Sequence, residues 1–274
     1  MAEEFVSASD GCRLWTSKAG SGAPVVFLHG GPGWWDIFAD LADALAPVAV
    51  VCRWDQRGCG RSERRGPYTL DRTLADLDEL RAHFGFSEMA LVGHSWGADL
   101  ALRYAMAFPA RVTHLVLMCT AGPGSARYRR RLRGVLAPHQ ERISELVRSA
   151  PSAERNRALL RLRISFGFAN QRTALHMADQ LTQPYSYNDD YEAALTADTE
   201  AISEHALAEA YRALDIPTLL LHGAEDLHPP EVTDGLLAAL PKAHRTVIDG
   251  AAHYPWLEQP EPTATTLREF LCGI

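Results

Sequence analysis

Short, continuous apolar runs alternate along the chain with stretches in which apolar residues recur every three or four positions. Continuous runs are typical of strands that are buried on both faces, as in a parallel sheet. We expect such strands at residues 24–28, 47–52, 89–92, 114–118, 217–221 and 245–248. The helical spacing is clearest over residues 70–84, where charged residues separate the leucines. This alternation predicts an α/β fold with a mostly parallel sheet flanked by helices.

Two segments depart from the alternation. Asp10 and Gly11 form a turn-favouring pair between two segments that can be strands, which predicts a hairpin at the start. Residues 122–211 look like successive helices without a convincing buried strand, so we expect an inserted helical cap. The predicted organisation is a core of residues 1–121 and 212–274, with the cap at 122–211.

A candidate nucleophile lies in residues 93–97, which read Gly-His-Ser-Trp-Gly. This G-x-S-x-G pattern directly follows a predicted strand and precedes a stretch compatible with a helix. A sharp strand-to-helix turn needs small residues at both ends and makes a serine hydroxyl project from the sheet. A serine in such a pattern can also be an ordinary turn residue, but the flanking elements favour Ser95 as a nucleophile.

A serine hydroxyl needs a histidine to take its proton and a carboxylate to orient that histidine. In sheets with this turn, the chain order is serine, acid, histidine. The strand at 217–221 ends in an acidic turn, where Asp226 is our choice and Glu225 is the competitor. His253 follows the last predicted strand and precedes the last helix. We therefore predict that Ser95, Asp226 and His253 act together.

Backbone donors for a developing negative charge can come from a glycine-rich loop. Residues 29–33 read His-Gly-Gly-Pro-Gly and follow a predicted strand, so their backbone can approach a substrate closely. We expect the amides of Gly31 and Trp96 to form an oxyanion hole, in which each aimed donor contributes roughly 3 to 4 kcal/mol.

Charge and composition narrow the possible partners. The 274 residues carry a formal net charge of -7, which disfavours a general nucleic-acid surface. The arginine-rich run at 127–133 is expected to be the solvated side of a helix. We expect no membrane span, no secretion signal and a cytoplasmic location. Five cysteines without CxxC spacing predict reduced packing residues and no metal site.

Three motifs together resemble the proline iminopeptidase-like branch of the α/β-hydrolase fold superfamily: residues 29–33, residues 55–62 (Asp-Gln-Arg-Gly-Cys-Gly-Arg-Ser) and residues 93–97. The resemblance implies a hydrolase without a cofactor, with a helical cap over a small pocket and a small-molecule or short-peptide substrate. It also implies that residues 55–62 form a structural turn in which Asp55 and Arg57 make buried hydrogen bonds.

Two departures bear on the substrate. His94 stands where the aminopeptidases usually have glycine, and their acidic cap motif, which binds the substrate's amino group, is not found. Glu200 and Glu204, in the acidic half of the cap, are candidates to replace it. The prediction is a serine hydrolase that cleaves a small ester or amide through an acyl-enzyme. The alternatives are a true prolyl aminopeptidase and a non-catalytic ligand-binding homologue.

Overall fold

A single mixed sheet forms the centre of the molecule. The structure, a computed structural model, describes residues 2–123, 137–150, 152–182 and 184–272. Within them, eight strands pair in the order β1-β2-β4-β3-β5-β6-β7-β8. The strands are β1 (Ala2–Ser7), β2 (Arg13–Gly20), β3 (Ala23–Leu28), β4 (Ala49–Trp54), β5 (Met89–His94), β6 (Val112–Met118), β7 (Thr218–Gly223) and β8 (Ala243–Ile248). Strands β3 to β8 run parallel, whereas β1 and β2 are antiparallel to their neighbours.

The predicted fold class is confirmed. Each of the six expected strands is present with small differences at its ends, and β1 pairs with β2 across the Asp10–Gly11 turn as a hairpin. The expected burial on both faces is wrong for the last of them, because residues 243–248 form an edge strand that is only partly buried. Helix α2 (Leu70–His83) begins where the Thr69 side chain accepts a hydrogen bond from the Arg72 amide. It ends just before Gly85, whose φ of 72° lies in the left-handed region that favours glycine.

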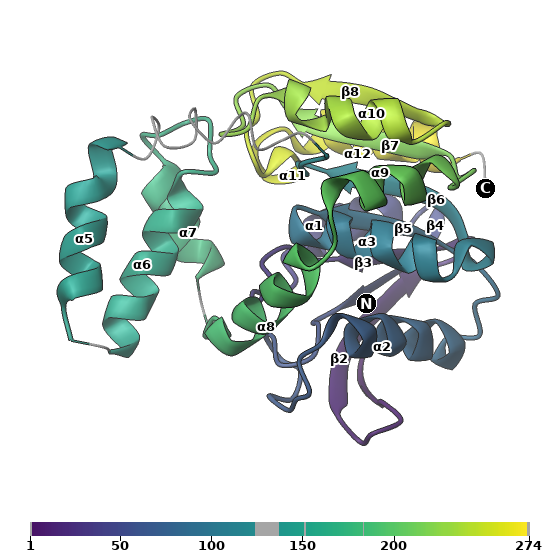
Figure 1. The fold of residues 1–274 in the computed structure, drawn as a ribbon, viewed down its shortest axis with the longest axis horizontal. Helices are drawn as coiled ribbons and strands as arrows, with labels where there is room; N and C mark the ends of the chain where they lie inside the picture. The colour runs from purple at the N-terminus through teal and green to yellow at the C-terminus, as the bar shows by residue number, and fades with distance from the viewer. Residues whose placement is uncertain (1, 124–136, 151, 183, 273–274) are drawn as a thin grey trace.

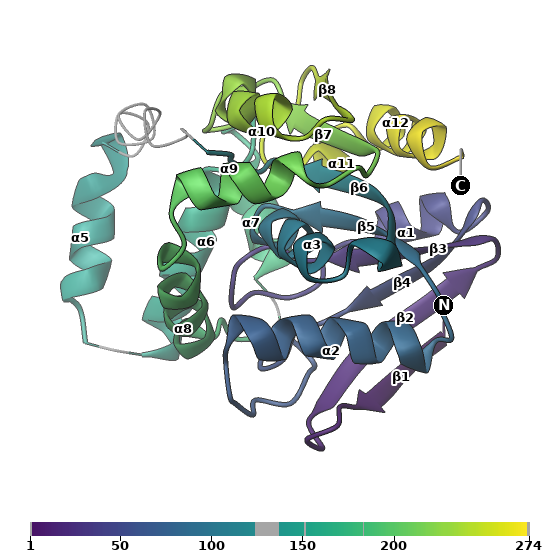
Figure 2. The same cartoon turned by 45° about the vertical axis from the view of Figure 1, so that its right-hand side comes forward.

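Helices cover both faces of the sheet (Figure 1, Figure 2). On one face lie α2, α3 (Trp96–Ala107), α9 (Glu204–Arg212) and α10 (Asp234–Ala239). On the other lie α1 (Ala39–Leu45), α11 (Pro255–Glu258) and α12 (Pro260–Leu271). Short 3-10 turns are η1 (Pro109–Arg111), η3 (Ala137–His139) and η4 (Pro230–Thr233). Along β5, Leu91 packs with the first group and Val92 with the second, so both faces are apolar.

The segment between β6 and β7 contains helices but no strand in its described part. The helices are α5 (Gln140–Arg148), α6 (Ala153–Ser165), α7 (Ala174–Leu181), α8 (Asp189–Glu200) and α9. Figure 1 shows α5, α6 and α7 standing to one side of the sheet. By contrast, α8 contacts α2, and α9 contacts α3 and α10. The domain boundaries stay a prediction, and the arginine-rich run at 127–133 lies outside the described residues.

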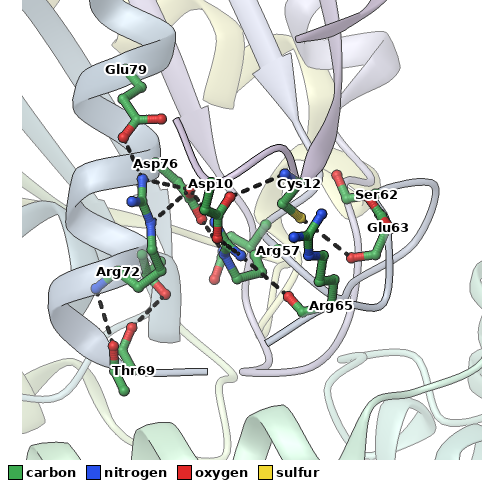
Figure 3. Close-up of polar contacts among 12 residues, drawn as sticks. Asp10, Cys12, Arg57, Ser62, Glu63, Arg65, Thr69, Arg72, Asp76 and Glu79 are labelled. Atoms are coloured by element: carbon green, nitrogen blue, oxygen red, sulfur yellow. Dashed lines mark hydrogen bonds and ion pairs between the residues drawn. The ribbon is translucent and has the colours of Figure 1, made fainter. Parts of the chain in front are cut away.

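Residues 55–62 form the buried turn that the resemblance implies (Figure 3). The Arg57 side chain is 0% exposed and donates through Nε and Nη2 to the two carboxylate oxygens of Asp76, at 2.7 and 2.8 Å. Its Nη1 donates to Asp10 at 2.8 Å, which ties the first hairpin to α2. Asp55 accepts the Asp36 amide at 2.7 Å. The expected buried hydrogen bonds of Arg57 and Asp55 are therefore confirmed.

We expect Asp76→Asn to lower the free energy of unfolding by about 3 kcal/mol, because it leaves the buried Arg57 guanidinium without its main counter-charge. Urea denaturation measures the change. Glu79→Gln is the matched control, since Glu79 also pairs with Arg72 on this helix but its side chain is 30% exposed. Its cost should stay below about 1 kcal/mol. Equal losses in the two variants would contradict the assignment.

Two expectations from composition concern membranes and thiols. Within the part of the chain that the structure describes, no helix is both long and apolar enough to cross a bilayer.

The cysteines form no disulfide in the structure. Cys12, Cys52, Cys59 and Cys119 are buried, and Cys272 is exposed. Four of the five cysteines therefore pack in the interior as predicted, and Cys272 does not.

Candidate active site

The predicted site residues meet at the carboxyl edge of the parallel sheet. Ser95 follows β5, Asp226 follows β7 and His253 follows β8, while Gly31 lies in the loop after β3. Because parallel strands end at the same edge, these loops converge there. A cavity of about 550 Å³, the serine cavity, is lined by these residues together with Trp96.

Ser95 occupies a strained turn. Its φ is 53° and its ψ is -117°, a conformation that costs a non-glycine residue about 1 to 3 kcal/mol. The turn is tight enough to require glycine on both sides. A Cβ on Gly93 would lie 2.3 Å from the Gly97 carbonyl oxygen, and one on Gly97 would lie 2.0 Å from that of Leu28. The packing therefore explains both glycines of the motif and places Ser95 at the start of α3.

His253 and Asp226 are joined directly. Nδ1 of His253 lies 2.8 Å from Oδ2 of Asp226, a buried carboxylate whose other oxygen accepts the His228 amide at 3.1 Å. Glu225, the competing acid, is exposed to solvent. Since Nδ1 faces Asp226, Nε2 is the ring nitrogen left for a substrate or for Ser95. Among the described residues, His253 and Ser95 do not yet form a hydrogen bond, although both line the serine cavity.

Electrostatic interaction between Asp226 and His253 shifts the pKa of both groups. Burial alone would lower the pKa of His253, but the charge and hydrogen bond of Asp226 outweigh it and raise that pKa above its usual value. Burial likewise opposes ionisation of Asp226, yet His253 holds the pKa of this carboxyl well below its ordinary range. Asp226 is therefore an anion, and His253 can carry positive charge beside it.

The main chain of His253 is held on both sides. Its amide donates to the Gly167 carbonyl at the end of α6, at 2.8 Å, and its carbonyl lies 2.8 Å from Nε2 of His94. Burial keeps the pKa of His94 well below its usual value, so this neutral ring donates through Nε2. Glu258 accepts the neighbouring Ala252 amide at 2.7 Å. The sequence did not reveal these contacts, because no local pattern links His94 to a residue 159 positions further along the chain.

The glycine-rich loop packs against the serine. A Cβ on Gly30 would lie 3.4 Å from the Ser95 Cβ, so the loop backbone borders the reacting position. Trp96 is the first residue of α3, and an amide at this place has no carbonyl partner within its own helix. Gly31 and Trp96 both line the serine cavity. Gly31 and Trp96, whose amides are the predicted oxyanion donors, thus lie around the same cavity as Ser95.

Gln56 connects this loop to the turn after Ser95, a role that the sequence did not reveal. Its amide N–H donates to Nε2 of His29 at 2.9 Å, and its side-chain nitrogen donates to the His29 carbonyl at 2.9 Å. Its side-chain oxygen accepts from the Trp96 indole at 3.0 Å. Burial lowers the pKa of His29 to about 4, so that ring is neutral and donates through Nδ1 to the Gly30 carbonyl.

The two acidic cap candidates are not among the described residues around the serine cavity. Glu204 is the first residue of α9 and is exposed to solvent. Glu200 is the last residue of α8, and the structure does not describe its side chain. Of the described residues, Asp226 and Asp99 are the carboxylates that line the cavity, and Asp99 accepts a hydrogen bond from Nε of Arg103 at 2.8 Å. A guanidinium from α6, that of Arg163, also lines the wall.

One group of side chains in the described part of the chain is close enough to be considered for a metal ion. The donor atoms of Cys119, Asp226 and His253 lie within 4.8 Å of one another. Burial raises the pKa of the Cys119 thiol well above its usual value, which opposes the thiolate that metals bind. The Asp226 and His253 atoms are already bonded to each other. This donor set fits a hydrogen-bonded cluster better than a metal centre.

Comparisons with known proteins agree with the fold. A family model described as the alpha/beta hydrolase fold matches residues 23–260. A proline iminopeptidase of Heyndrickxia coagulans is 27% identical over 93% of this chain and 92% of its own. A non-heme haloperoxidase of Rhodococcus erythropolis is 28% identical over 91% and 92%. A solved esterase of Thermogutta terrifontis is 25% identical, with a TM-score of 0.76 over 99% of this chain and 98% of its own.

Proposed function

Because the chain belongs to the alpha/beta hydrolase fold family and resembles its proline iminopeptidase-like branch, we propose that it is a serine hydrolase of small esters or amides. The observation that carries the proposal is the convergence of Ser95 with the Asp226–His253 pair on one cavity. A serine at a strained strand-to-helix turn beside a carboxylate-oriented imidazole is the arrangement that nucleophilic acyl transfer needs.

In the proposed reaction, Ser95 Oγ attacks the substrate carbonyl carbon while His253 Nε2 takes the hydroxyl proton. The negative charge that forms on the carbonyl oxygen is stabilised by the amides of Gly31 and Trp96. His253 then gives its proton to the departing alcohol or amine, which leaves an acyl group on Ser95. Water, deprotonated by the same nitrogen, releases the acid. The first step requires the serine hydroxyl to turn toward Nε2 when substrate binds.

A fluorophosphonate probe tests the proposal. Such a probe phosphonylates an activated serine, so the wild-type protein should be labelled and Ser95→Ala should not. Mass spectrometry of the labelled peptide identifies the modified residue. A native, folded protein that stays unlabelled and cleaves no ester would instead support a non-catalytic ligand-binding homologue.

The activity should fall on the acid side of the pH profile. His253 must be neutral to accept the serine proton, and Asp226 raises the pKa of His253. We therefore expect kcat/KM for a neutral ester to decline as the pH falls through a value above 6.5, the ordinary histidine pKa. Asp226→Asn removes the negative charge and should move this inflection to lower pH. An unchanged inflection in that variant would show that the pH profile does not report the ionisation of His253.

A prolyl aminopeptidase is the second candidate, favoured by several relatives called proline iminopeptidase that match over 90% or more of this chain. It predicts release of an aryl amine from a prolyl amide, with loss of cleavage when the substrate's amino group is acylated. Cleavage of simple aryl esters alone would count against it. In this candidate Glu200 and Glu204 would have to reach the substrate's ammonium group, a role that remains a prediction.

A further inference from the structure

A second cavity of about 890 Å³ lies between the cap helices, beside the serine cavity. We call it the arginine vestibule, because four of the residues that line it are Arg64, Arg155, Arg157 and Arg163. The two cavities share Leu160, Arg163, Phe166 and Tyr187, which therefore form their common wall. Most of this wall comes from α6 and its C-terminal end, since Leu160 and Arg163 lie in this helix and Phe166 is its C-cap. A molecule bound at Ser95 thus has the vestibule as its neighbour.

The arginines of the vestibule are only partly neutralised. Arg163 pairs with Glu192 at 2.9 Å, and Arg64 donates to the main-chain carbonyls of Ser186 and Tyr187. Arg155 donates to neutral oxygens, those of the Asn156 side chain and the Ser149 carbonyl.

Arg157 has no ion pair with any residue that the structure describes, and Asp189 is the one carboxylate among the described lining residues. Four guanidinium groups therefore face a single lining acid. The whole chain carries a net charge of -7, so this positive charge is local and opposite in sign to the background. An anion would be attracted here, and an ammonium group would be repelled.

Among the residues that the structure describes, the lining of the serine cavity offers no compensating site for a cation. Its two lining carboxylates are both engaged, Asp99 with Arg103 and Asp226 with His253. The nearby Glu192 is engaged with Arg163. A guanidinium presents a planar pair of donors that matches an anionic oxygen group, most closely a carboxylate. The charged side chains of both cavities thus favour an anionic ligand over a cationic one.

We propose that the arginine vestibule binds an anionic group, such as a carboxylate, of a substrate whose ester or amide carbonyl reaches Ser95. The inference rests on the proposed serine hydrolase activity and narrows its substrate class to acidic esters or amides. Arg155 and Arg157 are the specificity residues, because they lie on α6 without a carboxylate partner among the described residues.

Two matched sets of esters test this. In the first, the para-nitrophenyl esters of adipate, hexanoate and aminohexanoate place a carboxylate, a methyl group or an ammonium at the end of similar acyl chains. In the second, the acetyl ester of para-hydroxybenzoate is compared with that of its methyl ester, which places the charge on the leaving group. We expect the carboxylate to raise kcat/KM by about fivefold or more in at least one set. This preference should shrink at high salt.

Variants locate the effect. Arg155→Gln with Arg157→Gln should bring the ratio of kcat/KM for the carboxylate ester to kcat/KM for the neutral ester close to one, whereas the corresponding lysine variants should keep part of the preference. Arg142→Gln is the matched control, since this exposed arginine of α5 pairs with Glu145 and does not line the vestibule. A preference for the ammonium ester, or equal turnover of charged and neutral esters, would overturn the proposal. So would a preference that survives the double glutamine variant.

The outcomes distinguish a failure of the vestibule proposal from a failure of the serine hydrolase proposal. If neutral esters are cleaved and Ser95 is labelled, but the arginine variants change no ratio, the vestibule proposal fails and the hydrolase proposal stands. If no ester is cleaved and Ser95 is not labelled in the folded protein, the hydrolase proposal fails and the vestibule proposal falls with it.

Discussion

Ser95→Ala is expected to lower kcat/KM for a neutral aryl ester by at least about 10⁴-fold, because it removes the atom that would form the acyl-enzyme. The remaining activity would come from the oxyanion donors and from binding alone. Alanine keeps the Cβ, and the Ser95 hydroxyl makes no hydrogen bond to the other described residues. The free energy of unfolding should therefore change by less than about 1 kcal/mol.

Steady-state kinetics and urea denaturation measure the two quantities on the same preparation. Ser149→Ala is the control, since Ser149 is an exposed serine after α5 and does not line the serine cavity. Its turnover should match that of the wild type. Ser95→Ala with undiminished turnover, in a sample free of other esterases, would remove Ser95 from the mechanism.

Asp226→Asn should lower kcat by about 10³ to 10⁴-fold, although the shape of the side chain is retained. The neutral amide cannot stabilise positive charge on His253, and it can donate to Nδ1, which favours the wrong tautomer. The loss should appear mainly in kcat, because Asp226 acts on the base and not on substrate binding. Near-native stability would show that the loss is chemical in origin.

Glu225→Gln is the matched control for the acid. It changes the adjacent carboxylate in the same way, but Glu225 is exposed and Asp226 is the residue bonded to His253. We expect Glu225→Gln to keep native turnover. The reverse result, with Glu225→Gln inactive and Asp226→Asn active, would assign the acid to Glu225.

Features encoded locally could be predicted from the sequence. The strand that ends at His94, the glycines around Ser95 and the helix after it all follow from short-range sterics and apolar spacing. The order of serine, acid and histidine then gave candidates at the ends of later strands. The choice between Glu225 and Asp226 depended on which side chain turns inward, and three-dimensional packing decides that.

Contacts between distant loops could not be predicted in this way. Gln56 bonds to His29 and Trp96, and His94 bonds to the His253 carbonyl, across separations of 27, 40 and 159 residues. No periodicity in one sequence marks such pairs, because they arise only where the strand ends meet. The walls of the two cavities have the same origin, since tertiary packing brings residues of α6 and of the loops at the strand ends around one space.

The positive φ of Ser95 affects which variants a screen for heat tolerance would select. A φ of 53° suits glycine better than serine, so Ser95→Gly would release part of the strain held in the turn. Variants screened for heat tolerance alone would then be enriched in a substitution that deletes the proposed nucleophile. Improvement of this protein by laboratory evolution therefore needs a turnover screen at every round, because robustness and chemistry make opposite demands on one residue.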